Sequence, residues 1–261
     1  MMFDEDQLRQ RLPVSGLGKL LSFHQQVTST NDLAHDLAEK GAPHGTLVVA
    51  EAQTQGRGRR NRGWITKPGR GLAISILLRP EQNIPTVWSR LHALSALSVA
   101  QALEGYQLQP KIKWPNDILL NGKKVAGILV ELTWDGDRLD YFVLGIGMNV
   151  AVGSVPQEFQ LQFPAVSIEE VLGKEVDPYE LVVKLLEGIN AHFSNLTQEN
   201  LFDRWEKKLT YVGQEVLLTG SEKEYSGIFL GINREGMVEL QTQDKVLEIE
   251  IGDYQMRLRN G

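Results

Sequence analysis

The spacing of apolar runs changes near Tyr211, and this change limits most strongly how the chain can fold. Before Tyr211, β-like apolar runs alternate with stretches of helical period. After it, five short strand-like runs are separated by Gly, Asn and Asp turns, which is typical of a small barrel of SH3 size. These runs are 214–218, 224–231, 236–241, 246–250 and 255–258. The pattern predicts an N-terminal extension (1–19), a mixed α/β domain (20–210) and an SH3-like β-barrel (211–261).

The first 210 residues contain patterns for several helices and strands. Helices are predicted at 4–12, 30–41, 86–104, 178–196 and 198–208, and strands at 20–27, 46–52, 71–79, 111–114, 117–120, 123–132 and 141–148. Ser29-Thr30-Asn31-Asp32 matches a capping box at the start of the second helix. Asn121-Gly122 predicts a tight hairpin turn. The 18-residue segment 53–70 has no apolar period and reads as a long loop, a kind of segment that is usually functional.

Cysteine is absent from the 261 residues. This excludes a disulfide framework, a thiolate nucleophile and any Cys-ligated metal. The acidic, polar N-terminus does not resemble a secretory signal, and the most apolar stretch, 91–103, is too short to cross a bilayer. We therefore expect a cytoplasmic protein with no membrane partner.

Positive charge is concentrated in one part of an acidic chain. The net charge is −6, yet 52–80 contains seven basic residues and no acidic one, so the rest of the chain carries −13. A local positive region on an acidic body suits a small anionic ligand better than a long polyanion.

Four of these basic residues lie in Gly56-Arg-Gly-Arg-Arg-Asn-Arg-Gly-Trp64. Guanidinium groups match phosphate and carboxylate oxygens, and glycines let the backbone approach a ligand. A solvated basic loop or an RNA-binding arginine tract explains the same residues equally well. The loop is neither a Walker A motif nor a dinucleotide fingerprint, because it lacks Gly-Lys-Ser/Thr and precedes a strand.

Three further motifs are weaker when each is taken alone. Lys111-Ile-Lys-Trp-Pro-Asn-Asp117 offers groups for a phosphate and Mg²⁺, although a strand end with an Asx turn is the simpler interpretation. In 122–131, strict alternation places Lys124 on one face with Ala126, and Gly127 on the other. The simpler interpretation there is an exposed hairpin lysine. Gly145-Ile-Gly-Met-Asn149 is a strand end that could present Asn149 to a ligand, although a turn is the simpler interpretation. The five histidines lack metal-ligand spacing.

Taken together and in order, these motifs identify a resemblance. With Ser29-Thr30-Asn31 and Gln53 they are similar to those of bacterial biotin protein ligases, the biotin–[acetyl-CoA-carboxylase] ligases, from about residue 20 to the end. The resemblance implies a class II synthetase-like catalytic domain with a C-terminal SH3-like barrel. It also implies ATP-dependent attachment of biotin to a lysine of biotin carboxyl carrier protein through biotinyl-5′-AMP.

The resemblance also implies roles for particular residues. Lys124 and Arg59 would be catalytic, and Asp117 a candidate Mg²⁺ ligand. The biotin-binding set would be Ser29, Thr30, Asn31, Gln53, Arg57, Gly58, Arg59, Lys124 and Gly127. The nucleotide-binding set would be Arg62, Trp64, Lys113, Asn116, Asp117 and Asn149.

Some members of that family carry an N-terminal winged helix-turn-helix. Only about 20 residues precede the expected catalytic domain here, too few for that fold, so we expect no DNA partner. A homodimer paired through a sheet edge is a further expectation from the resemblance.

Two alternatives remain open from the sequence. A lipoate or octanoate ligase or transferase shares the catalytic fold, but its fatty chain would require an apolar lining. A non-catalytic RNA-binding or regulatory protein would use the arginine loop alone, and it would show steep salt dependence.

Overall fold

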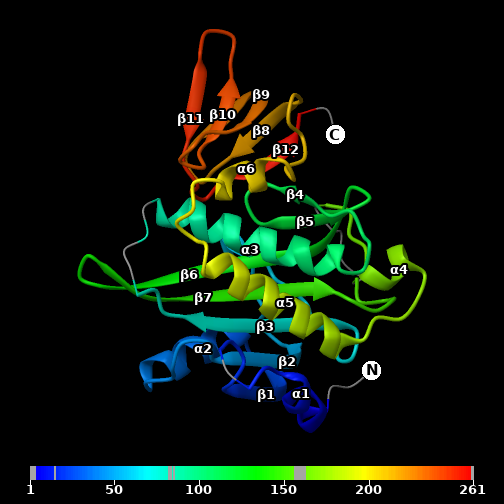
Figure 1. Ribbon diagram of the computed structural model, residues 1–261. Coiled ribbons are helices and arrows are strands. Elements are labelled where there is room, and N and C mark those ends of the chain that lie inside the picture. The colour runs from blue at the N-terminus through cyan, green and yellow to red at the C-terminus, as the bar shows by residue number, and fades with distance from the viewer. Residues whose placement is uncertain (1–3, 15, 82–83, 85, 156–162, 260–261) are drawn as a thin grey trace.

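The computed structural model describes residues 4–14, 16–81, 84, 86–155 and 163–259 (Figure 1). Its main element is a seven-stranded sheet in the order β1-β2-β3-β7-β6-β5-β4. The strands are β1 (Leu21–Val27), β2 (Leu47–Gln53), β3 (Gly71–Leu78), β4 (Lys111–Lys113), β5 (Asp117–Leu120), β6 (Lys123–Asp135) and β7 (Arg138–Asn149). β1 and β2 are parallel and the other pairs are antiparallel, so the predicted mixed sheet is present.

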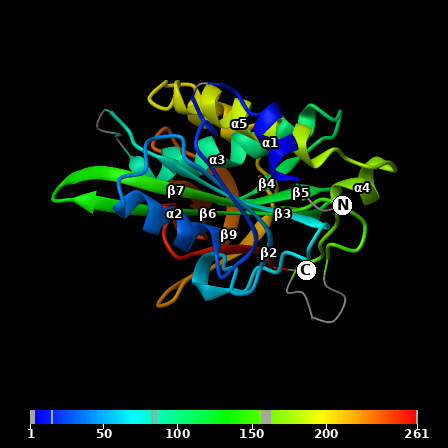
Figure 2. The same ribbon diagram turned by 90° about the horizontal axis from the view of Figure 1, so that it is seen from below.

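Helices cover the two faces of this sheet unequally (Figure 2). On one face lie α1 (Glu5–Arg11), α3 (Val87–Glu104) and α5 (Pro178–Phe193). Alternate residues of β3 are buried there in the large core: Leu72, Ile74, Ile76 and Leu78. On the other face α2 (Thr30–Glu39) packs against Leu77, Tyr141 and Val143 in a smaller cluster. Since that face has less helical cover, part of it is available for a pocket.

Two short helices complete this part of the chain. The sequence patterns did not predict α4 (Ile168–Leu172), although Ser167 and Glu170 form a complete capping box at its start. α6 (Leu201–Glu206) is shorter than the predicted helix 198–208 and packs against the second sheet. Among the described residues, no helix is both long and apolar enough to cross a membrane.

Each of the five runs after Tyr211 coincides with one strand of an antiparallel sheet in the order β11-β10-β9-β8-β12. The strands are β8 (Glu215–Thr219), β9 (Glu224–Ile232), β10 (Val238–Gln241), β11 (Val246–Ile249) and β12 (Gln255–Leu258). Val216, Leu218, Phe229 and Met256 are buried and continue the main core. The pairings observed in the described residues leave this sheet open between β11 and β12.

Two local predictions, a tight turn at Asn121-Gly122 and a capping box at α2, have different outcomes. Asn121 and Gly122 both take positive φ, 49° and 73°, so the tight turn between β5 and β6 is confirmed. The capping box at α2 is wrong. Ser29 occupies the N-cap position without a side-chain capping bond, and the backbone N–H of Thr30 donates instead to Gln53 Oε1 at 2.8 Å.

Candidate active site

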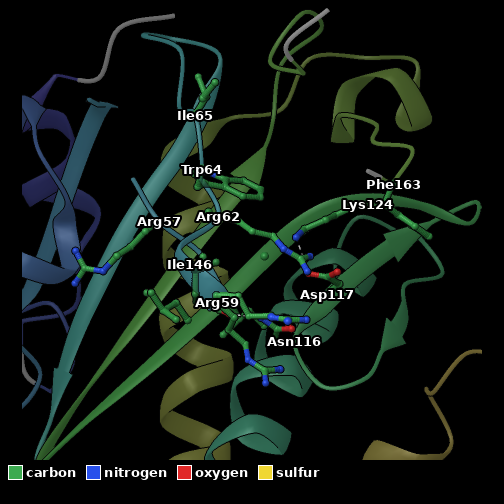
Figure 3. Close-up of a pocket in the computed structure, with 18 of the residues that line it drawn as sticks. Arg57, Arg59, Arg62, Trp64, Ile65, Asn116, Asp117, Lys124, Ile146 and Phe163 are labelled. Carbon is green, nitrogen blue, oxygen red and sulfur yellow. Dashed lines mark hydrogen bonds and ion pairs between the residues drawn. The ribbon is translucent and has the colours of Figure 1, made fainter. Parts of the chain in front are cut away.

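A pocket of about 540 Å³ opens between the seven-stranded sheet and the arginine loop (Figure 3). Tyr254 and Gln255, at the edge of the second sheet, also line it. Every site residue singled out from the sequence lines it. These are Ser29, Thr30, Asn31, Gln53, Arg57, Gly58, Arg59, Arg62, Trp64, Lys113, Asn116, Asp117, Lys124, Gly127 and Asn149. The fold therefore brings all the motifs to one cavity.

The floor of the pocket is bare backbone at three glycines of β6 and β7. Gly127 and Gly147 face each other across the two strands. A Cβ at Gly147 would overlap the indole of Trp64, and one at Gly145 would overlap the amide of Asn31. Flat side chains therefore lie directly on the sheet, which only glycine permits at these positions.

One end of the pocket is polar and already hydrogen-bonded. Gln53 Oε1 accepts from the backbone N–H of Thr30 at 2.8 Å and from its hydroxyl at 3.1 Å. Ser75 Oγ lies 2.7 Å from Thr30 Oγ1 and 2.6 Å from Asn31 Oδ1. Because Ser29, Thr30 and Asn31 are buried, this end presents fixed polar groups to a ligand.

The other end contains two ammonium groups that share one carboxylate. Lys124 Nζ lies 2.6 Å from Asp117 Oδ1, and Lys113 Nζ lies 3.8 Å from Asp117 Oδ2. Lys113 is buried, and this burial lowers its pKa even though Asp117 opposes the shift. Its ammonium also lies 4.1 Å from the centre of the Phe163 ring. Two cations against one anion leave an excess positive charge that suits phosphate.

A β-bulge determines where Lys124 points. The register of β5 against β6 shifts between Ile118 and Leu119, which pair with Ala126 and Lys124. The extra residue, Val125, breaks strict alternation and places Lys124 on the same side as Gly127. The predicted sharing of a face by Lys124 and Ala126 is therefore wrong, because Ala126 is buried in the core.

Asp117 is the one acidic residue among the described residues that line the pocket, and two lysines already hold its carboxylate. Within the described residues, no group of three His, Asp or Glu side chains could hold a metal ion. The residues present thus do not form a protein-built Mg²⁺ site. The assignment of Asp117 as a Mg²⁺ ligand stays a prediction, and we derive no step from it.

The arginine loop is more ordered than the predicted irregular segment. Gly58 N–H donates to Arg62 O, and Trp64 N–H donates to Gly56 O, both at 2.7 Å. A short 3₁₀ turn, η1 (Arg59–Asn61), forms its tip, where Arg60 takes φ of 59°. Figure 3 shows Arg57 turned away from Lys124 and Asp117.

Three guanidinium groups of this loop contact the second sheet, and we call these contacts the loop–sheet contact. Arg60 donates to the carbonyls of Thr219 and Gly220 at 3.1 and 3.3 Å. Arg59 donates to the carbonyl of Gly252, and Arg62 donates to the side chain of Gln255. Burial lowers the pKa of Arg59. The heads of Arg59 and Arg62 thus rest on neutral oxygens that a phosphate could replace, whereas Arg60 also lies 3.5 Å from the carboxylate of Asp253.

Two predicted nucleotide-site residues also have structural contacts. Asn116 Nδ2 donates to the carbonyl of Ile128 at 2.7 Å, and Asn149 Nδ2 lies 3.5 Å from the carbonyl of Lys124. Both amides therefore connect to β6 at the pocket edge. The turn considered at 145–149 is wrong, because β7 continues through Asn149.

Several pocket residues were missed in the sequence. Gly145 and Gly147 had a usable signal, because their spacing of two puts both on one face of a strand. Phe163, Tyr254 and Gln255 had no usable signal in the sequence, because only the tertiary fold brings their segments to the pocket.

Comparison with known proteins gives a consistent result. Residues 23–149 match the Biotin/lipoate A/B protein ligase family. The "Bifunctional ligase/repressor BirA" of Bacillus subtilis is 33% identical over 261 residues, covering 97% of this chain and 78% of that protein. The "Biotin--[acetyl-CoA-carboxylase] ligase" of Paracoccus denitrificans is 32% identical over 222 residues, covering 82% of this chain and 90% of that protein.

A solved structure of the biotin protein ligase from Aquifex aeolicus in complex with biotin and ATP superposes with a TM-score of 0.80. It is 32% identical and covers 92% of this chain and 99% of that one. The chain therefore belongs to the biotin/lipoate A/B protein ligase family.

Proposed function

We propose that this protein attaches biotin to a lysine of a biotin carboxyl carrier protein in two steps, of which the first consumes ATP. In the first, a carboxylate oxygen of biotin attacks the α-phosphorus of ATP, pyrophosphate leaves, and biotinyl-5′-AMP forms. In the second, the carrier amine attacks the acyl carbon and loses a proton, and AMP leaves. The observation that carries this proposal is a single pocket with a fixed polar end and a strongly cationic end.

The polar end suits the ureido ring of biotin, which has two N–H donors and one carbonyl acceptor. We assign Ser29, Thr30, Asn31 and Gln53 to this ring. Thr30, Asn31 and Gln53 are held in place by hydrogen bonds among themselves and to Ser75, so their remaining donors and acceptors lie in fixed positions that favour a ring with matching groups. We assign the residues between the two ends, Arg57, Gly58, Arg59 and Gly127, to the rest of biotin and its carboxylate.

The cationic end suits the reacting phosphate. Lys124 would offset the repulsion between the carboxylate and the α-phosphate, and Arg59 would cover the mixed anhydride. Trp64 would lie against adenine, with its ring 5.4 Å from the ammonium of Lys124. Arg62, Lys113, Asn116, Asp117 and Asn149 complete the nucleotide set. The protein's contribution is positioning and electrostatics, with no covalent enzyme intermediate.

The same pocket decides between biotin and a lipoyl or octanoyl substrate. A fatty chain offers no hydrogen-bond partner to the Thr30–Gln53 or Ser75–Asn31 groups, so it would remove water from this polar end without forming a hydrogen bond there. These contacts favour biotin, and the relatives named as biotin ligases support the same choice.

The deciding experiment measures pyrophosphate release from Mg·ATP with biotin, with lipoate, with octanoate and with no acid. Apo carrier protein is then added. Biotin-dependent release followed by transfer of label to the carrier is the expected result. Release with lipoate or octanoate but not biotin would reassign the substrate, and no release with any acid would contradict the proposed reaction.

The organisation of the chain is part of the proposal. We propose a catalytic domain at 20–210, preceded by an extension at 1–19, and an SH3-like domain at 211–261. The change in the spacing of apolar runs near Tyr211 and the five antiparallel strands that follow it support this division. We further propose a homodimer and a cytoplasmic location, where ATP is available. The acidic net charge of −6 supports the absence of a DNA partner.

A further inference from the structure

Glu131 lies just outside the pocket and contacts two of its residues. It belongs to β6, two positions beyond Leu129, a lining residue. Its Oε2 accepts from Asn31 Nδ2 at 2.6 Å, and its Oε1 accepts from Arg57 Nη2 at 3.1 Å. Glu131 ends the 122–131 motif, but the motif alone assigned it no role, because both of its partners come from distant parts of the chain.

The contact with Asn31 fixes the orientation of a buried amide. Asn31 Oδ1 accepts from Ser75 Oγ at 2.6 Å while its Nδ2 donates to Glu131, and the amide lies on the bare backbone of Gly145. A flipped amide would place its oxygen against a carboxylate, which repels it. Glu131 therefore determines which atom of Asn31 faces which neighbour.

The contact with Arg57 anchors the first arginine of the loop. Arg57 Nη2 also lies 2.5 Å from Asp32 Oδ1, so two acids hold one guanidinium. Burial pushes the pKa of Glu131 upward, but the bonds from His35, Asn31 and Arg57 outweigh it and hold the pKa at about 2. The carboxylate thus stays charged across the range in which the protein would work.

We propose that Glu131 is a positioning residue, which holds the Asn31 amide in the geometry that the ring of biotin requires and holds Arg57 beside the rest of the ligand. This inference rests on the proposed function, because it names biotin as the ligand whose binding depends on Glu131. Glu131 acts through Asn31 and Arg57 and touches no reacting atom.

The test compares Glu131→Ala with Glu131→Gln. Biotin binding is measured by calorimetry without nucleotide, and KM for biotin and for ATP by pyrophosphate release. We expect Glu131→Ala to weaken biotin binding about 10-fold or more, since it removes a hydrogen bond to a charged group. Glu131→Gln keeps an oxygen that accepts from Asn31, so it should lose only about 3-fold. KM for ATP and kcat at saturating biotin should stay near wild type in both.

Two control variants separate the contributions. Asp32→Asn removes only the other acid on Arg57 and should weaken biotin binding less than Glu131→Ala. Asp140→Asn breaks a comparable ion pair with Arg79, 3.2 Å long and on β7, and should leave biotin binding at the wild-type value. Equal KM increases for biotin and ATP in Glu131→Ala would indicate general loosening and overturn the proposal.

Other outcomes are equally decisive. Wild-type biotin affinity in Glu131→Ala would overturn the proposal, and so would a Gln variant as weak as the Ala variant. A wild-type protein that binds no biotin would instead refute the proposed function. In that case hydrogen exchange of the Asn31 side-chain amide, followed by ¹⁵N NMR without ligand, tests the anchoring alone. Slow exchange in wild type and faster exchange in Glu131→Ala would support it, and equal exchange would refute it.

Discussion

The indole of Trp64 lies directly on the backbone of Gly147, so closely that a Cβ at this position would overlap the ring. The two residues lie more than eighty positions apart in the chain, and the pairing of Gly147 with Gly127 across β6 and β7 makes the floor on which the ring rests. Any side chain at Gly147 must therefore move Trp64.

Gly147→Ala should weaken ATP binding about 10-fold and biotin binding less, because Trp64 is assigned to adenine and stacking contributes about 1 kcal/mol or more. Calorimetric titration with each ligand checks this. The matched control is the same change in a Trp64→Ala background, where no ring remains to be displaced. A similar loss of ATP affinity in both backgrounds would disprove the steric explanation.

Lys124→Ala should slow biotin-dependent pyrophosphate release by roughly 10²-fold or more, as expected when one charge-stabilising group is removed from an active site. Single-turnover measurement isolates this step. The ion pair of Lys124 with Asp117 requires a second measurement of thermal stability, since a lost partner also affects folding. Unchanged pyrophosphate release would show that Lys124 is not the group that stabilises the reacting phosphate.

Arg59→Gly should speed the release of biotinyl-5′-AMP, because the guanidinium that we assign to cover the intermediate is removed together with its bond to the carbonyl of Gly252. An increase in the off-rate of roughly 10-fold corresponds to about 1.4 kcal/mol. Trapping the released intermediate with hydroxylamine provides the measurement. An off-rate equal to that of wild type contradicts the assignment.

Arg60→Ala should loosen the arginine loop without ligand present. Arg60 makes two bonds to the carbonyls of Thr219 and Gly220 and an ion pair of 3.5 Å with Asp253. Hydrogen exchange at 56–64 should become faster, while exchange in the main sheet stays as in wild type. Equal loop exchange in the two proteins would show that these bonds do not hold the loop.

Acid should destabilise the protein partly through His92. Burial, with a smaller effect of the Arg59 charge, lowers the pKa of His92 to about 3. The unfolded chain, with an ordinary pKa near 6.5, binds a proton more readily, so stability is present above pH 6.5 and is lost as the pH falls toward 3. His92→Gln should remove on the order of 2 kcal/mol of the loss between pH 7 and pH 5. Urea unfolding at these two pH values tests this, and identical pH dependence in both proteins would refute it.

How much could be foreseen from the sequence depended on whether the signal was local. β5 lies at 117–120 as predicted, because the Asn121-Gly122 turn that ends it is set by two residues. The side on which Lys124 points was mispredicted, since the bulge at Val125 arises from pairing with another strand. The site motifs were visible because each is contiguous. Ser75 and Gln255 were not visible, and Glu131 was seen only as the end of the 122–131 motif with no role, because only the folded chain brings these residues to their partners.

Because of the loop–sheet contact, the C-terminal sheet competes with a bound phosphate for the side chains of Arg59, Arg60 and Arg62. A phosphate that draws Arg59, Arg60 or Arg62 inward must release oxygens at Gly252, Thr219, Gly220 or Gln255. Thermodynamic linkage makes this effect reciprocal. If nucleotide binding weakens the loop–sheet contact by some factor, then forming that contact weakens nucleotide binding by the same factor. Under the proposed roles of these arginines, substitutions in the C-terminal sheet around Thr219 and Gly252 would change how tightly the intermediate is held without changing the arginines themselves.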